Sequence, residues 1–230
     1  METNNKEYDL NMKVALSNLI GKKVNSMKRI HGGRNSRIYR MFFDNSDSHI
    51  AKLYSPYDID KRNRLEVEFS SLKFLWDNGI TCVPKPIFVN NEKHIGIYEY
   101  IPGRKIPSEE VTSSDIKSIT NLLSKLHEIK TKKESKNFPA ASAACFSVRD
   151  IENIIKTRLY RLLAVDDDSM QYTKLREFLK NEFIPSFDEI VKNCKLNFKK
   201  DGLSFDYKIN EEERTLSPSD FGFHNALRKD

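Results

Sequence analysis

Two polar residues near the end of the chain have the types and spacing that phosphoryl transfer requires. In SPSDFGFHNAL, residues 217–227, Asp220 and Asn225 stand among small, turn-forming and aromatic residues. A carboxylate beside an acceptor hydroxyl can orient it and receive its proton, and a nearby amide oxygen can bind Mg²⁺. A loop of the form D-x-x-x-x-N supplies both groups, although this spacing also arises by chance. The loop must therefore be weighed together with the residues that precede it.

A glycine pair and a lysine earlier in the chain could bind the phosphates of a nucleotide. Gly32 and Gly33, in HGGRNSRIYRM at 31–41, would let backbone N–H groups approach a phosphate, and Ser36 could donate to its oxygens. Lys52, in HIAKLY, follows about one strand later, where a cation could contact the α and β phosphates. The alternatives are an ordinary hairpin turn for the glycines and a solvent-exposed side chain for the lysine.

The helical segment that follows offers two glutamates as partners for this lysine. Glu68 lies one residue before Phe69 and four before Leu72, at the edge of the apolar stripe of the segment. Glu66 is the competitor, and its alternative role is to lie on a solvated helix face. On the residues alone, both glutamates stay candidates.

A strand-like run that ends in a proline turn could contact a purine. In IYEYIPG, residues 97–103, the backbone of Glu99, Tyr100 and Ile101 would form a hinge that meets the edge of the base. The alternative is a strand that simply ends at Pro102.

Apolar periodicity predicts a β-rich part followed by a helical part, and therefore an α+β fold. Turn formers separate the strands, PGRKIP interrupts the β pattern, and the spacing is helical from residue 108 onward. We predict two lobes with a cleft between them, residues 1–103 and 104–230. The predicted strands are 24–30, 36–43, 49–54, 87–90 and 94–101. The predicted helices are 8–20, 58–78, 113–129, 148–165 and 172–194, the last interrupted at Pro185.

The composition excludes several classes of protein. At 230 residues, with 38% hydrophobic and 10% aromatic content, the chain can build a core. Its apolar runs are too short to span a membrane, and residues 1–13 are too polar for a signal peptide, so we predict a cytoplasmic protein. The three cysteines lack metal-ligand spacing. The net charge of +6 is scattered among nearly as many carboxylates, which predicts no nucleic-acid partner and suits a phosphate-bearing small molecule equally well.

The ordered set of segments resembles the aminoglycoside phosphotransferase and choline kinase group of the protein-kinase-like fold. GGRNSRIYR is similar to the nucleotide loop of that group, AKLY to its strand lysine, and EVEFSSLKFLWDNGI to its glutamate helix. PKPIFV resembles the following strand, GIYEYIPG the hinge, LLSKLHEI the first helix of the second lobe, and SPSDFGFHNAL the catalytic loop. The resemblance covers most of the chain.

This resemblance assigns roles to the candidate residues. The family register E-x-x-x-L-x-x-L selects Glu68 over Glu66 as the partner of Lys52. It implies that Asp220 is the catalytic base, that Asn225 is a metal ligand, and that ATP or GTP binds with Mg²⁺ in the cleft. The expected reaction is transfer of the γ-phosphate to a hydroxyl of a small molecule, with an aminoglycoside, choline or a sugar as candidate acceptors.

Two departures from the family pattern qualify these expectations. Pro218 stands where the family usually has a histidine two residues before the catalytic aspartate. The family also places a second metal-binding aspartate on a strand beyond the asparagine, and this chain ends at Asp230. We therefore expect a piece of a longer kinase whose helical lobe is incomplete, the alternative being a natural short form. The missing aspartate also keeps a second function open, a non-catalytic module that binds a nucleotide or a partner.

Overall fold

The computed structural model describes residues 2–30, 36–44, 47–55, 63–218 and 220–229. The chain divides into two compact units, Met1–Pro139 with Leu216–Asp230, and Ala140–Thr215. The C-terminal segment therefore returns to the unit that contains the sheet. The lobe boundary predicted at residue 103 stays a prediction.

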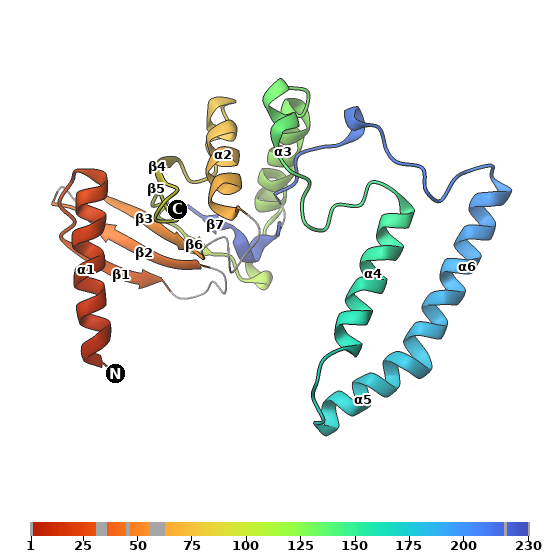
Figure 1. Ribbon diagram of the computed structural model, residues 1–230. Coiled ribbons are helices and arrows are strands. Elements are labelled where there is room, and N and C mark those ends of the chain that lie inside the picture. Colours follow the sequence, from red (N-terminus) through yellow and green to blue (C-terminus); the bar gives the residue numbers. More distant parts are fainter. Residues whose placement is uncertain (1, 31–35, 45–46, 56–62, 219, 230) are drawn as a thin grey trace. The chain divides into compact units, whose positions relative to one another are not determined.

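Five antiparallel strands form the sheet of the first unit (Figure 1). Their spatial order is β1-β2-β3-β5-β4, so that β5 pairs with both β3 and β4. The predicted α+β fold with an N-terminal antiparallel sheet is confirmed, and the strand boundaries differ from the prediction by a few residues. The strands are β1 Ser26–Ile30, β2 Ser36–Phe42, β3 Ser48–Tyr54, β4 Pro86–Asn90 and β5 Ile95–Glu99.

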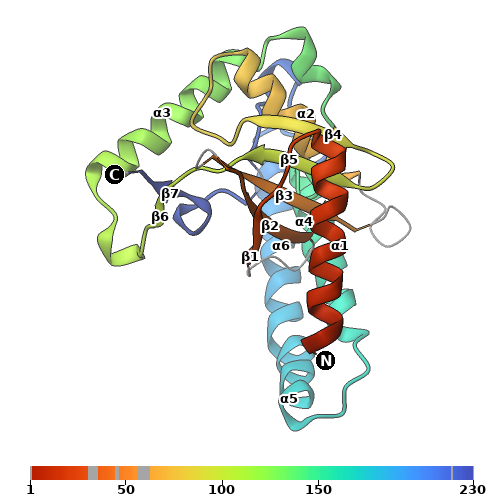
Figure 2. The same cartoon turned by 90° about the vertical axis from the view of Figure 1, so that its left-hand side faces the viewer.

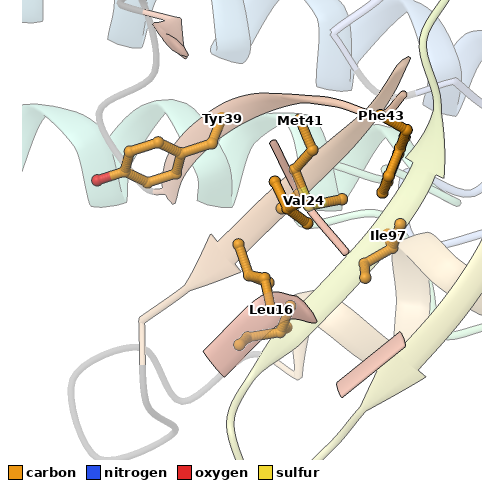
Figure 3. Close-up of a cluster of buried hydrophobic side chains, with 8 residues drawn as sticks. Leu16, Val24, Tyr39, Met41, Phe43 and Ile97 are labelled. Carbon is orange, nitrogen blue, oxygen red and sulfur yellow. The ribbon is translucent and has the colours of Figure 1, made fainter. Parts of the chain in front are cut away.

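One face of the sheet packs against the first helix, α1 (Glu2–Ile20), which starts earlier than predicted. The helix ends at Gly21, whose φ of +64° suits a residue without a Cβ. Because strand side chains alternate between faces, every second residue of β2, β3 and β5 points into this core. Figure 3 shows the cluster, whose buried members are Leu16, Val24, Tyr39, Met41, Phe43, Ala51, Ile95 and Ile97.

Helix α2 (Arg64–Asp77) contacts β4 and β5. The Asn63 side chain caps its first turn by accepting the backbone N–H of Glu66, and Gly79, with a φ of +78°, follows its end. The earlier part of the predicted helix, from residue 58 to 62, lies outside the described residues. Phe74 of α2 is buried with Ile80 and two residues of the next helix, Leu126 and Ile129, in a second apolar cluster.

The segment after the sheet begins with a short strand, β6 (Arg104–Lys105), and a 3₁₀ turn, η1 (Ser108–Glu110). Helix α3 (Ser113–Ile129) follows and has the predicted bounds. Its N-terminus is a capping box, in which Thr112 and Asp115 each accept a backbone N–H of the other. The 3₁₀ turn η2 (Lys133–Asn137) then leads out of the first unit.

The second unit is helical. Its helices are α4 (Val148–Leu163), α5 (Met170–Phe178), the π-helical turn η3 (Leu179–Phe183), α6 (Ile184–Lys200) and the 3₁₀ turn η4 (Glu211–Glu213). The predicted interruption at Pro185 takes the form of this π turn. Proline has no N–H to donate to the preceding turn, and a widened turn accommodates that loss without ending the helix. None of the described helices of the chain is long and apolar enough to cross a membrane.

The chain then returns to the first unit. Leu216 packs against the cluster that contains Phe74, and a 3₁₀ turn, η5 (Phe223–Asn225), leads into the strand β7 (Leu227–Arg228). Strand β7 pairs antiparallel with β6, and the two lie side by side in both views (Figure 1, Figure 2). This pairing attaches the segment with Asp220 and Asn225 to the connector that follows the sheet.

Candidate active site

An ion pair joins the strand lysine to the glutamate helix. Lys52, on β3, places its Nζ 2.8 Å from Oε1 and 2.6 Å from Oε2 of Glu68 on α2. The lysine and glutamate side chains are 22% and 36% exposed, so the pair is partly shielded and still accessible from solvent. A cation held in this way is a suitable group to contact a phosphate.

The competing glutamate has a different partner. Glu66 is exposed in the first turn of α2, where it accepts a hydrogen bond from the side-chain amide of Asn63. Two residues advance a helix by more than half a turn, so Glu66 and Glu68 cannot occupy the same face. The capped start of α2 therefore sets the register that turns Glu68 toward Lys52.

The face of the sheet around Lys52 is distinct from the face that packs on α1. Lys52 and Tyr54 alternate with the core residue Ala51 along β3, and Gly96 and Tyr98 lie on the same face of β5. Lys52 is directly opposite Gly96 in the register of the two strands. The lysine is therefore flanked by a backbone position without a side chain on the neighbouring strand.

The predicted phosphate loop is described only at its end. Gly32 and Gly33 fall in residues 31–35, which lie outside the described residues. Ser36 is the first residue of β2, is half-buried, and pairs with Tyr54 of β3. The end of the predicted loop thus adjoins the strand that carries Lys52.

The predicted hinge begins at the last residue of β5. The backbone N–H of Glu99 donates to Lys85 O over 2.8 Å, and the Glu99 carboxylate accepts from the Lys85 N–H over 3.2 Å. The guanidinium of Arg40 lies 3.4 Å from the centroid of the Tyr100 ring. Ile101 is half-buried and follows the strand. Glu99 is thus engaged with the β4 side of the sheet, and Tyr100 is held by β2 through a cation–π contact.

The Asp220 loop is organised by hydrogen bonds among its own residues. The Asn225 side-chain amide donates to Asp220 O over 2.8 Å, and the Asn225 backbone N–H donates to Gly222 O over 2.9 Å. The carbonyl oxygen of the Asn225 side chain is then the atom that could bind a metal. The Asp220 carboxylate is exposed, which leaves it accessible to a substrate hydroxyl.

The loop also contains a histidine that reasoning from the sequence missed. His224 Nε2 lies 3.2 Å from Oδ1 of Asp220. A histidine four residues after an aspartate in a turn rich in glycine and aromatics is the signal that could have identified it. A Cβ at Gly222 would lie 2.7 Å from Nδ1 of His224, so the absent side chain makes room for the ring.

All the residues predicted for the site belong to the unit Met1–Pro139 with Leu216–Asp230. Two grooves on the described part of the chain lie elsewhere. One of about 520 Å³ lies beside α2 and includes Glu66, Phe74 and Phe138. The other, of about 430 Å³, lies between α4 and α6 in the second unit. Neither groove is lined by Lys52, Glu68, Asp220 or Asn225, so the candidate site consists of these polar side chains and includes neither groove.

The oxygen donors of the Asp220 loop suit a hard cation. Mg²⁺ is commonly bound by one or two protein oxygens together with phosphate oxygens and waters, and the side-chain oxygen of Asn225 could be one of these protein oxygens. Over the described ranges, no group of three or more His, Cys, Asp or Glu residues could hold a metal by itself.

Solved structures match the fold. A spectinomycin phosphotransferase, solved with ADP and spectinomycin, matches with a TM-score of 0.61 and 18% identity, over 96% of this chain and 65% of that one. An ethanolamine kinase from Plasmodium vivax matches with a TM-score of 0.50 and 17% identity, over 75% of this chain and 48% of that one. No family model matches the sequence, and no curated protein matches it significantly.

These matches show the class of fold. The protein has a kinase-like fold, similar to that of the spectinomycin phosphotransferase, and that match covers most of the chain. The chain spans less than two thirds of the length of either matched structure.

Proposed function

We propose that the protein transfers the γ-phosphoryl group of ATP or GTP to a hydroxyl of a small molecule. The observation that carries this proposal is the Lys52–Glu68 ion pair in the unit that also holds the loop of Asp220 and Asn225. Phosphoryl transfer needs a fixed cation for the phosphates and a carboxylate for the acceptor. The kinase-like fold supports this assignment.

Each residue would have a separate task. Lys52 would contact the α and β phosphates, and Glu68 would keep its ammonium in place. Gly32, Gly33 and Ser36 would supply donors to the phosphates, and the backbone of Glu99, Tyr100 and Ile101 would contact the purine. These contacts would hold the nucleotide in one orientation, which is the larger part of catalysis in a reaction without a covalent enzyme intermediate.

Asp220 would act at the acceptor. Its exposed carboxylate would orient the attacking hydroxyl and receive its proton as the oxygen bonds to the γ-phosphorus. The bond from this phosphorus to the bridging oxygen of the β-phosphate would break in the same step, with ADP or GDP as the leaving group. His224, in contact with Oδ1 of Asp220, would restrict the carboxylate to one orientation. Asn225 would bind Mg²⁺ through its side-chain oxygen, and the bound ion would neutralise charge on the phosphates.

A non-catalytic nucleotide-binding module is the second candidate. It is favoured by the small donor set of the loop, because the described residues contain no acidic cluster able to hold a metal alone. Such a module would use Lys52 and Glu68 in the same way and would make no use of Asp220.

An acceptor panel separates the two candidates. The protein is incubated with γ-labelled ATP or GTP, Mg²⁺ and aminoglycosides, choline, ethanolamine or sugars, and labelled product is quantified. We expect transfer to one class of acceptor and its loss in Asp220→Asn, while Asp168→Asn, an exposed aspartate of the second unit, serves as the control. Nucleotide binding without transfer to any acceptor would favour the module, and unchanged transfer in Asp220→Asn would remove this residue from the mechanism.

A further inference from the structure

Two buried tyrosines lie beside the Lys52–Glu68 pair on the same face of the sheet. Tyr54 follows Lys52 by two residues on β3, and Tyr98 lies on the neighbouring strand β5. Their hydroxyl oxygens are 2.8 Å apart, and the residues are 7% and 3% exposed. Nζ of Lys52 lies 5.0 Å from the centroid of the Tyr54 ring. The two hydroxyls therefore form a polar pair in an otherwise buried setting next to the ion pair.

The position of the Tyr98 ring is fixed from two sides. A Cβ at Gly96 would lie 2.5 Å from the Tyr98 hydroxyl oxygen and 2.8 Å from ring carbons Cε2 and Cζ, so the ring occupies the space that a side chain at 96 would take. From α2, the ring of Phe69 contacts it with centroids 6.1 Å apart. Phe69 is the residue after Glu68, so the helix that carries the glutamate also packs on this tyrosine.

The charge of Glu68 acts on both tyrosines. Burial raises the pKa of Tyr54 well above its ordinary value, and the negative charge of Glu68 and the contact with Tyr98 raise it further. Burial also raises the pKa of Tyr98, and Glu68 adds to this rise while the hydrogen bond with Tyr54 opposes it. Both hydroxyls therefore keep their protons at neutral pH. A protonated hydroxyl is a donor that a carboxylate can use without charge repulsion.

An ion pair alone is a weak anchor for a partly exposed glutamate. Pairs between long side chains near the surface contribute little, because fixing two flexible chains opposes the Coulomb attraction. Rigid, buried donors lose little entropy when they hold a carboxylate, since their rings are already packed.

We propose that Tyr54 and Tyr98 are positioning residues: the Tyr98 hydroxyl holds the Tyr54 hydroxyl in place, and the Tyr54 hydroxyl holds the carboxylate of Glu68 against Lys52 before a nucleotide binds. Lys52 is then presented in one place, and the nucleotide does not have to order it. The consequence for nucleotide affinity rests on the proposed function, whereas the effect on the ion pair does not.

The test measures the reactivity of Lys52 in the protein without nucleotide. Acetic anhydride is added in limiting amounts, and the rate of acetylation at Lys52 is followed by peptide mass spectrometry. Glu68→Gln sets the rate for an unpaired lysine. Tyr54→Phe and Tyr98→Phe remove one hydroxyl each at nearly constant volume. Tyr39→Phe is the matched control, because Tyr39 is a buried tyrosine on the opposite face of the sheet.

We expect both tyrosine variants to raise the acetylation rate of Lys52 roughly fivefold, as the loss of one hydrogen bond predicts, with Tyr39→Phe unchanged. Gly96→Ala, which displaces the Tyr98 ring, gives the same increase by an independent route. An unchanged rate in both tyrosine variants would overturn the proposal, as would an unchanged rate in Glu68→Gln or an equal rise in Tyr39→Phe.

A second arm separates this proposal from the proposed function. The Kd of Mg·ATP is measured by calorimetry for the same variants, and we expect it to rise in Tyr54→Phe and Tyr98→Phe and to stay unchanged in Tyr39→Phe. If the parent protein does not bind ATP or GTP at all, the proposed function fails, and the acetylation rates still decide whether the tyrosines hold Glu68.

Discussion

Arg228 and Asp115, 113 positions apart in the sequence, form a two-point ion pair. Arg228 Nη2 lies 2.5 Å from Oδ2 of Asp115, and Arg228 Nε lies 3.1 Å from Oδ1. The same Asp115 accepts hydrogen bonds from the backbone and the hydroxyl of Thr112 at the start of α3. Because Arg228 is on β7, directly after the Asp220 loop, this pair fastens the loop to the N-terminus of α3.

The Asp115 pair predicts a pH dependence of stability. The hydrogen bonds from Arg228, and then those from Thr112, hold the pKa of Asp115 well below its usual range. A carboxylate with a lowered pKa in the folded state stabilises the fold fully above its unfolded pKa, and this contribution is lost as the pH falls through the folded value. We expect the melting temperature of the parent protein to exceed that of Asp115→Asn at pH 6, and the difference to shrink below about pH 4, where an aspartate of the unfolded chain takes up its proton. A difference that is constant from about pH 6 down to about pH 2.5 would contradict this assignment.

The two glutamates of α2 should differ in their effect on nucleotide binding. Glu68→Gln removes the charged partner of Lys52, and we expect the Kd of Mg·ATP to rise about three- to tenfold, a modest change because the pair is partly exposed. Glu66 lies two residues before Glu68 and contacts Asn63 instead of Lys52. The Kd of Mg·ATP for Glu66→Gln should therefore remain at the parent value. Calorimetric titration of both variants tests this, with thermal melts to show that they are folded. An equal rise of the Kd in both variants would contradict the role of Glu68 as the partner of Lys52 at the nucleotide site.

His224 should affect turnover more than nucleotide affinity. It contacts Asp220, which acts on the acceptor in our proposal, so His224→Ala is expected to lower kcat roughly tenfold with little change in the KM for ATP. Gly222→Ala should act in the same direction, since its Cβ would displace the histidine ring. Steady-state kinetics with the acceptor found in the panel measure both. A rise in the KM for ATP at constant kcat would place His224 at the nucleotide instead.

The cluster between α1 and the sheet should dominate the stability of the first unit. Leu16 is fully buried, and Leu16→Ala is expected to lower the free energy of unfolding by about 2–5 kcal/mol. Leu10 lies on the same helix with 56% of its surface exposed, so Leu10→Ala should change the free energy by less than about 0.5 kcal/mol. Urea unfolding followed by circular dichroism compares the two. Similar losses would mean that α1 does not pack on the sheet through Leu16.

Local signals explain why much of the fold could be predicted. The bounds of α3 follow from an apolar period of 3.6 residues and from the Thr112–Asp115 capping box, both of which are local in sequence. The strands could be predicted because alternating apolar and polar residues form short runs that turn-forming residues separate. The burial of Phe74 depends on Leu126 and Ile129 of another helix, so the sequence of α2 alone does not specify it. The π turn at Leu179–Phe183 likewise has no local signature beyond Pro185.

The candidate site could be predicted only in part for the same reason. The residues alone left Glu66 and Glu68 as candidate partners of Lys52, and the family resemblance selected Glu68, which the structure pairs with the lysine. The return of the Asp220 loop to the first unit depends on the two-residue strands β6 and β7 and on Arg228, which pairs with Asp115, 113 positions earlier in the sequence. The tyrosine pair depends on the alignment of β3 with β5, which one strand alone does not specify.

A calorimetric titration of the protein with ATP, with and without Mg²⁺, tests the proposed nucleotide site, and it is repeated for Lys52→Met and Asn225→Ala. We expect saturable binding that Mg²⁺ strengthens, a large loss of affinity in Lys52→Met, and loss of the Mg²⁺ effect in Asn225→Ala. At about ten times the Kd, binding should also stabilise the fold by about 1.4 kcal/mol. No heat of binding at millimolar ATP and GTP, with the protein folded, would contradict the assignment of this site, as would equal affinity in the parent protein and Lys52→Met.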